Sequence, residues 1–318
     1  MGLFKRSETV LWMDAPSYSR KFLPDIQDIQ SVDLHTIPDK GLRLFLSDIF
    51  RTKTLFRGRT AIPGWATACV LKSSQRSHYD LLIEQGRLQR LLPTPLFCIA
   101  GTSTRCHGQR DRPWSALEGN LHLSVSFHPQ RVISDFTPGL LALAAVSVIE
   151  TLDNLPGFKD KAGIKWVNDI LVADSKVGGF LVYTQSTGHI VHTVVMGLGL
   201  NIETHPQIFP DSFVPEASCL QDFNLSVTRI EILETLLHKL HMNFRLLKKG
   251  GASRLIDTYR QRSLVLGRQV KVLSDPINRK ETSDVIAMGV VDQISDQLEL
   301  IIRDHDDPVT QGRLVFLD

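Results

Sequence analysis

Between residues 65 and 127, short apolar runs alternate with amphipathic stretches, a pattern typical of a domain that mixes strands and helices. The runs at 65–71 and 95–101 predict strands, and the segment 79–88 between them predicts a helix. In 121–127 (LHLSVSF), apolar residues alternate strictly with His and Ser, which predicts a half-buried antiparallel strand. A sheet with helices in its connections is therefore expected.

The next segment predicts one buried helix followed by an antiparallel meander. Thr137 is expected to cap the helix, Pro138 to occupy its first position, and the helix to continue to Leu152. Because this stretch is apolar on nearly every side, it must pack against a sheet. Three strand candidates joined by short links follow, at 169–173, 179–184 and 192–202.

The last third of the chain predicts two helices and then a group of short strands. Thr228 and Glu231 match a capping box, and the apolar stripe that follows them ends at Gly250. A second amphipathic helix is predicted at 252–262. Beyond it, four β segments (RQVKVL, VIAMGVVDQI, QLELIIR and GRLVFLD) predict a small all-β domain.

These elements predict an α/β (α+β) chain in three parts. Residues 61–263 form the main domain, 264–318 a small β domain, and 1–60 an N-terminal extension of uncertain structure. In the extension only 41–50 has a helical pattern, so a helix-turn-helix module is not expected. We expect the extension to pack on the main domain.

Composition narrows the function classes. The 318 residues are 42% hydrophobic, enough for a sizeable core, and 36 basic against 34 acidic side chains give a net charge of +2. A balance this even does not predict a nucleic-acid partner. The four cysteines lack the spacing of a zinc site or disulfide framework, and neither a signal peptide nor a bilayer-spanning stretch is evident. A cytoplasmic location is predicted.

Three groups of residues carry a chemical signal: Lys165–Asp169 (KWVND), Lys176 with the glycines that follow it, and Met196–Ile202 (MGLGLNI). A lysine at a hairpin turn beside glycines can reach a carboxylate and an α-phosphate together, because no side chain blocks the approach of the backbone. Lys176 is thus a candidate to stabilise the charge of an adenylation transition state. Most lysines in such turns are merely exposed, so the hypothesis depends on the surrounding groups.

The polar residues near Lys176 have two interpretations. Asn168, Asp169 and Asn201 flank apolar strands, where short polar side chains often bond only to nearby backbone. We assign a functional role to Lys176 and Asn168. For Asp169 and Asn201 both interpretations stay open. Trp166 is assigned to packing, together with Lys165.

These groups resemble, in order and spacing, the K-W-P-N-D, K-x-x-G and G-x-G-x-N motifs of the biotin protein ligase catalytic domain, in the biotin/lipoate A/B ligase family. The resemblance runs from about Leu71 to the C-terminus, whose β segments resemble the family's SH3-like domain. It implies a class II synthetase-like mixed or antiparallel sheet flanked by helices. It also implies that Asn168 contacts nucleotide, that Asp169 lies near phosphate or Mg²⁺, and that adenylate is bound by Gly178, Gly179 and Asn201.

Residues 102–114 (TSTRCHGQRDRPW) resemble the family's loop Q-T-x-G-R-G-R-x-G-R-x-W, which holds the acid and its adenylate. Four positions keep the family residue: Thr104, Gly108, Arg112 and Trp114. Five depart from it: Ser103, Cys106, His107, Gln109 and Asp111. Gln109 stands in place of the family's principal arginine, and a neutral amide cannot make the charge-assisted, bidentate contact of a guanidinium. Arg110 is a candidate to compensate, so Arg110 and Arg112 join Lys176 as catalytic candidates, with Ser103 and Gln109 among the binding residues.

Upstream, Ser73, Ser74 and Gln75 resemble the family triplet that contacts the head group of the acid. Cys106 and His107 invite a cysteine-hydrolase hypothesis, but adjacent side chains of an extended segment point to opposite faces. The glycines before Asn201 lack the third glycine, the helix and the acidic partner of a dinucleotide site.

The resemblance implies an ATP-dependent biotin protein ligase. ATP, Mg²⁺ and biotin would give biotinyl-5'-AMP, whose biotin passes to a lysine of a biotin carboxyl carrier domain. Nucleic acid and membrane are not expected as partners, and a homodimer is left open. Two alternatives remain: a lipoate or octanoate ligase, and a binding or scaffold relative that has lost turnover, which Gln109 and Asp111 favour.

Overall fold

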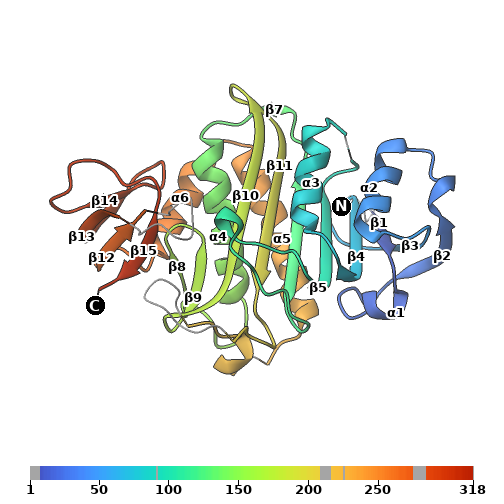
Figure 1. Ribbon diagram of the computed structural model, residues 1–318, viewed down its shortest axis with the longest axis horizontal. Helices are drawn as coiled ribbons and strands as arrows, with labels where there is room; N and C mark the ends of the chain where they lie inside the picture. The colour runs from blue at the N-terminus through green and yellow to red at the C-terminus, as the bar shows by residue number, and fades with distance from the viewer. Residues whose placement is uncertain (1–7, 91, 208–215, 225, 275–283, 318) are drawn as a thin grey trace, which may run out of the picture.

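The structure is a computed structural model that describes residues 8–90, 92–207, 216–224, 226–274 and 284–317. A large sheet carries most of the chain, and a smaller one is formed by its C-terminal part (Figure 1). The large sheet has the order β2-β3-β1-β4-β5-β6-β11-β10-β9-β8, with β7 paired to β11. Since β4 pairs in parallel with β1 and β5 while the other pairs are antiparallel, the sheet is mixed, as predicted.

The bounds of the strands in the large sheet follow, in chain order: β1 (Thr9–Met13), β2 (Gln27–Asp33), β3 (Thr54–Thr60), β4 (Thr67–Ser74), β5 (Leu96–Ser103), β6 (Leu121–Phe127), β7 (Arg131–Val132), β8 (Ala162–Lys165), β9 (Asp169–Val172), β10 (Ser175–Thr187) and β11 (Ile190–Leu200). The predicted meander of 169–202 is confirmed, because β9, β10 and β11 pair antiparallel in succession.

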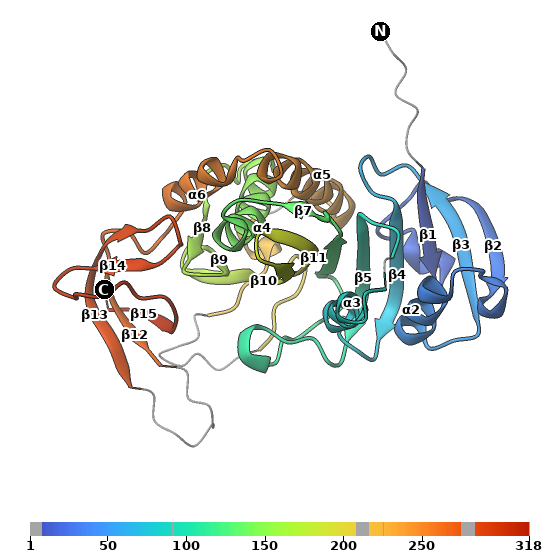
Figure 2. The same cartoon turned by 90° about the horizontal axis from the view of Figure 1, so that it is seen from above.

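Helices cover both faces of this sheet (Figure 2). On one face lie α4 (Phe136–Asp153), α5 (Arg229–Leu247) and α6 (Ala252–Gln261), packed over the larger core. On the other lie α2 (Lys40–Phe50) and α3 (His78–Arg87), over a smaller core, and the short α1 (Pro16–Ser19) precedes β2. The capping box of Thr228 and Glu231 at the start of α5 is confirmed.

Residues 9–60 add three strands to the large sheet instead of lying on it as an irregular extension. β1 is inserted between β3 and β4, so the N-terminal strands continue the sheet of the main domain. The helix predicted at 41–50 is present as α2. The two boundaries near residues 60 and 263 stay predictions.

Three expectations were wrong. β6 is buried on both faces, because α3 packs over the side that carries its His and Ser residues. α4 begins at Phe136, with Asp135 at the cap position, so Thr137 does not cap it. α4 is also long and apolar enough to cross a membrane by length and composition, contrary to expectation, but 72% of it is buried inside the protein, as in a core helix.

The small sheet has the order β14-β13-β12-β15 and matches the predicted C-terminal strands. Its strands are β12 (Gln269–Leu273), β13 (Val285–Ile294), β14 (Leu300–Ile302) and β15 (Arg313–Phe316). It lies beyond β8, at one end of the large sheet (Figure 1). There the indole nitrogen of Trp166 donates a hydrogen bond of 2.7 Å to the carbonyl of Leu298, and Trp166 also lines the cavity described below.

Candidate active site

A cavity of about 380 Å³ lies on the face of the large sheet that carries α3. Its floor is formed by β6, β11, β10 and β9, and its walls by the start of α3, the loop 106–115 and residues 312–314 of the small sheet. Every region that carried a chemical signal in the sequence, apart from the serine triplet at 73–75, contributes to it.

Two glycines of β11 make room for aromatic rings on this floor. A Cβ at Gly197 would lie 3.0 Å from the ring of Tyr79, and one at Gly199 would lie 2.4 Å from the indole of Trp114. Both rings therefore rest directly on the strand backbone. The G-x-G spacing follows from strand geometry, because residues two apart point to the same face.

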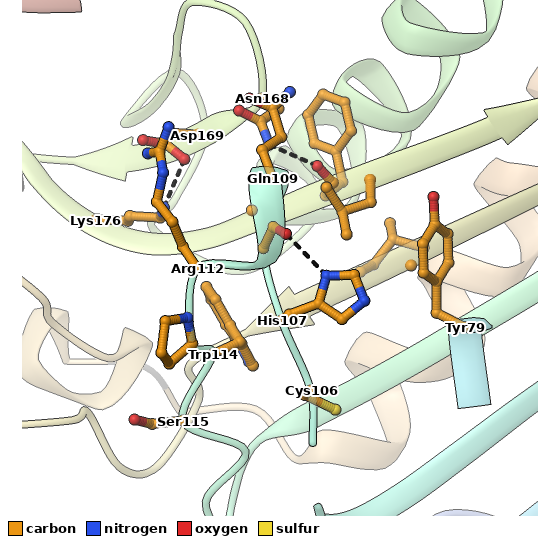
Figure 3. Close-up of a pocket in the computed structure, with 18 of the residues that line it drawn as sticks. Tyr79, Cys106, His107, Gln109, Arg112, Trp114, Ser115, Asn168, Asp169 and Lys176 are labelled. Atoms are coloured by element: carbon orange, nitrogen blue, oxygen red, sulfur yellow. Dashed lines mark hydrogen bonds and ion pairs between the residues drawn. The ribbon is translucent and has the colours of Figure 1, made fainter. Parts of the chain in front are cut away.

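One end of the cavity is cationic. The Lys176 ammonium lies 2.6 Å from the Asp169 carboxylate, and Figure 3 shows Arg112 extending toward the same carboxylate. Burial lowers the pKa of Lys165, partly offset by Asp169. Burial also lowers the pKa of Arg112, helped by the charge of Arg313. Lys165, Lys176, Arg112 and Arg313 thus bring four positive charges to this end of the cavity, an arrangement suited to a polyanion such as a triphosphate.

The other end is polar and uncharged. His78 Nδ1 lies 2.5 Å from Ser124 Oγ, and His122 Nε2 lies 3.0 Å from the carbonyl of Leu117. Burial lowers the pKa of His78 to about 3 and also lowers the pKa of His122, so both rings are neutral near pH 7. Among the described residues, His78 Nε2 and His122 Nδ1 are buried without a hydrogen-bond partner. Such atoms are available to a polar ligand.

Strand register separates the two ends. His122 of β6 is opposite Gly199 of β11, which is opposite Gly179 of β10, which in turn is opposite Asp169 of β9. Three strand spacings amount to about 14 Å. Figure 3 agrees, since Tyr79 lies on the far side of His107 from Lys176 and Asp169. The cavity therefore fits an elongated ligand with an anionic end and a polar, neutral end.

The loop over the cavity is held to α3. His107 Nε2 lies 2.9 Å from Asp80 Oδ1, and its Nδ1 lies 2.9 Å from the carbonyl of Gly108. Burial opposes protonation of His107, but these two hydrogen bonds raise its pKa. The amide of Trp114 donates to the carbonyl of Cys106 and closes the loop. His107, a departure from the family loop, thus anchors it.

Most of the predicted site residues line the cavity: Gly108, Gln109, Arg112, Trp114, Asn168, Asp169, Lys176, Gly179 and Asn201. Asn168 donates a 2.7 Å hydrogen bond to the carbonyl of Phe180, and Asn201 one of 3.1 Å to the carbonyl of Ser218. These two side chains therefore also hold the walls of the cavity in place.

Other predicted residues do not line it: Arg110, Ser73, Ser74, Gln75, Ser103, Thr104 and Gly178. Arg110 donates instead to the Gln311 side chain at 3.3 Å, and Gln75 accepts from Arg51 at 2.8 Å. The positions expected for the triplet at 73–75 are taken four residues later by Ser77, His78 and Tyr79, at the start of α3.

Four lining residues were missed as functional candidates: Lys165, His78, His122 and Arg313. The strict alternation of β6 carried a signal for His122 and Ser124, because three polar residues on one face mark a polar surface. The prediction of a half-buried strand places that surface in solvent. No local pattern marked Arg313, whose position depends on the docking of the small sheet.

The residues fit neither a protein-only metal site nor a cysteine nucleophile. Among the described residues, no group of three His, Cys, Asp or Glu side chains is placed to hold a metal ion. Asp169 is a single carboxylate engaged by Lys176, so Mg²⁺ would need ATP phosphates for most of its ligands. Burial raises the pKa of the Cys106 thiol, and the neighbouring His107 bonds to Asp80, which leaves Cys106 a poor nucleophile.

Comparison with known proteins finds similarity over the part of the chain that carries most of the site. Residues 67–201 match the Biotin/lipoate A/B protein ligase family. The Bifunctional ligase/repressor BirA of Bacillus subtilis is 31% identical over 152 residues, 48% of this chain and 44% of that protein. The Biotin--[acetyl-CoA-carboxylase] ligase of Mycobacterium tuberculosis is 27% identical over 213 residues, 66% of this chain and 75% of that protein. The chain thus spans less than half the length of the B. subtilis relative.

Solved structures show the same fold. The biotin protein ligase from Aquifex aeolicus in complex with biotin and ATP superposes with a TM-score of 0.57 at 20% identity, over 78% of this chain and 97% of that one. A biotin protein ligase-like protein of unknown function from Silicibacter gives 0.52 at 12% identity, over 72% and 87%. At these identities the likeness concerns the fold alone, which confirms the predicted class.

Proposed function

We propose that the chain is an ATP-dependent biotin protein ligase. Residues 67–201, which match the Biotin/lipoate A/B protein ligase family, support this proposal. Its acid is biotin and its first product biotinyl-5'-AMP. The acceptor is a lysine of a carboxylase carrier domain, in keeping with the name of the M. tuberculosis relative. The observation that carries the proposal is the two-ended cavity, cationic at Lys176 and Arg112 and polar at His78 and His122.

The first step is adenylation. A carboxylate oxygen of the acid attacks the α-phosphorus of ATP, and pyrophosphate leaves with the electrons of the broken P–O bond. Negative charge grows on the phosphoryl oxygens, and Lys176 and Arg112, already in the cavity, stabilise it without first having to move into place. Mg²⁺, when bound to the phosphates, supplies further charge neutralisation.

The second step is transfer. The neutral amine of the acceptor lysine attacks the acyl carbon of the mixed anhydride, AMP leaves, and the ammonium proton is lost to solvent. Between the steps the loop 106–115, held to α3 through His107 and Asp80, shields the anhydride from water.

The polar end of the cavity supports biotin over lipoate or octanoate. An alkyl chain offers no polar atom to His78 Nε2 and His122 Nδ1, which have no hydrogen-bond partner in the protein, and so leaves both unsatisfied. The ureido group of biotin carries both donors and acceptors and can bond to them. The M. tuberculosis and A. aeolicus relatives both carry biotin in their names.

The repressor activity in the name of the B. subtilis relative is not part of the proposal. Residues 9–60 form three strands, the four-residue α1 and α2, and in the described residues these two helices do not match a DNA-reading module. We propose a cytoplasmic enzyme without a nucleic-acid or membrane partner.

ATP–pyrophosphate exchange with biotin, lipoate and octanoate offered separately tests the proposal. Exchange that biotin alone drives, and that the Lys176→Ala variant loses, would support biotin adenylation. Exchange driven by lipoate or octanoate would instead favour the lipoyl-type ligase. Silence with all three acids, from folded protein that binds ATP, would favour the scaffold relative that Gln109 and Asp111 suggested.

A further inference from the structure

The small C-terminal sheet contributes to the cavity wall through Gly312, Arg313 and Leu314. Leu314 is buried in the core of the small sheet, and β15 begins at Arg313. Because neighbouring residues of a strand point to opposite faces, Arg313 points away from that core and toward the cavity. Gly312 permits this approach, since its φ of +137° and a Cβ only 2.5 Å from Val272 exclude larger residues.

The small sheet is docked at a defined position. Trp166, which precedes β9, donates to the carbonyl of Leu298, and Arg260 of α6 donates to the carbonyl of Ile294 at 2.8 Å. Arg110 of the loop reaches Gln311, two residues before Arg313. Contacts from three separate elements therefore hold the small sheet against the main domain, two at its β13–β14 edge and one just before β15. Figure 2 shows the small sheet at the end of the large sheet, beside α6 and β8.

Arg313 adds charge where charge is already concentrated. Its guanidinium acts electrostatically on both Arg112 and Lys165, and both of these cations are substantially buried. Like charges held together in a partly buried site repel one another, and Asp169 acts on both Arg112 and Lys165 in the opposite direction. A bound polyphosphate would turn this repulsion into attraction.

The loop itself carries less charge into the cavity than expected. Gln109 lines the cavity as a neutral amide, and Arg110, our candidate to compensate for it, does not line the cavity. Arg112 is thus the cavity-lining arginine of the loop, and the other cavity-lining arginine of the described residues is Arg313, from the small sheet.

We propose that Arg313 binds the phosphates of ATP in the adenylation site and supplies the guanidinium that Gln109 does not provide. The proposal rests on the proposed function only for the identity of the nucleotide. It makes the small sheet part of the nucleotide site, so that adenylation requires both sheets to be docked together.

Calorimetric titration of the full chain with ATP and, separately, with adenosine tests the proposal without any acid present. We expect Arg313→Gln to weaken ATP binding by about 10- to 100-fold and to leave adenosine binding unchanged, because a lost charge-assisted contact affects only the phosphates. Arg303→Gln, an exposed arginine of the same small domain paired with Asp292, is the matched control and should bind ATP like the original chain.

A compensating substitution sharpens the test. Gln109→Arg in the Arg313→Gln background should recover most of the ATP affinity. ATP affinity within twofold of the original in Arg313→Gln would overturn the proposal. So would equal losses for ATP and adenosine, which would show that the small sheet had moved, and so would an original chain that binds no ATP. Exchange that fails with all three acids while Arg313→Gln still weakens ATP binding would refute the biotin proposal alone.

Discussion

The two ends of the cavity share one sheet but are built differently. The polar end comes from adjacent elements, β6 and the start of α3, and its histidines are neutral. The cationic end is assembled from the loop, β8, β9, β10 and the small sheet, and it brings several positive charges together near Asp169. A binding site for an uncharged polar group can thus be formed by neighbouring elements. A site for a polyanion, in contrast, needs cations from distant parts of the chain.

The largest effect is expected at the cationic end. Lys176→Ala removes a donor aimed at the phosphoryl group, and we predict a fall in acid-dependent pyrophosphate exchange of about 10²- to 10³-fold. Lys249→Ala, at an exposed lysine after α5, is the control. A loss below threefold in Lys176→Ala would show that the cationic end does not take part in the chemistry.

The floor of the cavity between the two ends includes Gly197 and Gly199 of β11, and we expect a methyl group added at either position to lower activity. Gly199→Ala places a methyl group 2.4 Å from the Trp114 indole and must displace it, whereas Gly197→Ala meets Tyr79 at 3.0 Å. Overpacking of about 1–3 kcal/mol predicts a loss in kcat/KM of roughly 10- to 100-fold for Gly199→Ala and a smaller loss for Gly197→Ala. Equal activities in both variants would contradict this picture of the floor.

The polar end should control which acid binds. His78→Phe removes the buried ring nitrogens and the bond to Ser124, so we predict a KM for biotin about 10-fold higher, with kcat nearly unchanged. Octanoate should gain relative to biotin in the same assay. Ser124→Ala should shift the ratio in the same direction by less. A fall in kcat with no change in KM would assign His78 to the chemical step instead.

The last prediction concerns the pH dependence of stability, where we expect the smallest consequence for activity. Burial lowers the pKa of His78 to about 3, below its value of about 6.5 in the unfolded chain. The stability that depends on neutral His78 is therefore complete above pH 6.5 and is lost as pH falls from 6.5 toward 3, by about 2 kcal/mol at pH 5. Chemical denaturation of the chain and of His78→Gln between pH 7 and 5 checks this, and the variant should show a flatter profile.

The same contrast explains what could be predicted from the sequence. Local signals were enough for the meander and for the capping box of Thr228. The polar face of β6 was visible in the alternation, but its burial was not, because it depends on α3 packing over His122 and Ser124. Arg313 was out of reach, because its role depends on a docking geometry set by Trp166 and Arg260.

The shift from Ser73, Ser74 and Gln75 to Ser77, His78 and Tyr79 has a similar cause. A motif matched by residue type alone placed the contacts on β4, whereas the cavity is reached from the start of α3, which Ser77 caps through the amide of Asp80. The residues that face the cavity are thus determined by the point at which the chain leaves β4 and enters α3.

The most direct test of the two-ended cavity is to identify the acyl-adenylate that the protein holds. The full chain is incubated with ATP and an equimolar mixture of biotin, lipoate and octanoate, separated from free small molecules, and its bound products are analysed by mass spectrometry. The account predicts biotinyl-5'-AMP as the main product and its disappearance on addition of a carrier domain. Recovery of octanoyl- or lipoyl-AMP, or of no adenylate from protein that binds both ATP and biotin, would contradict it.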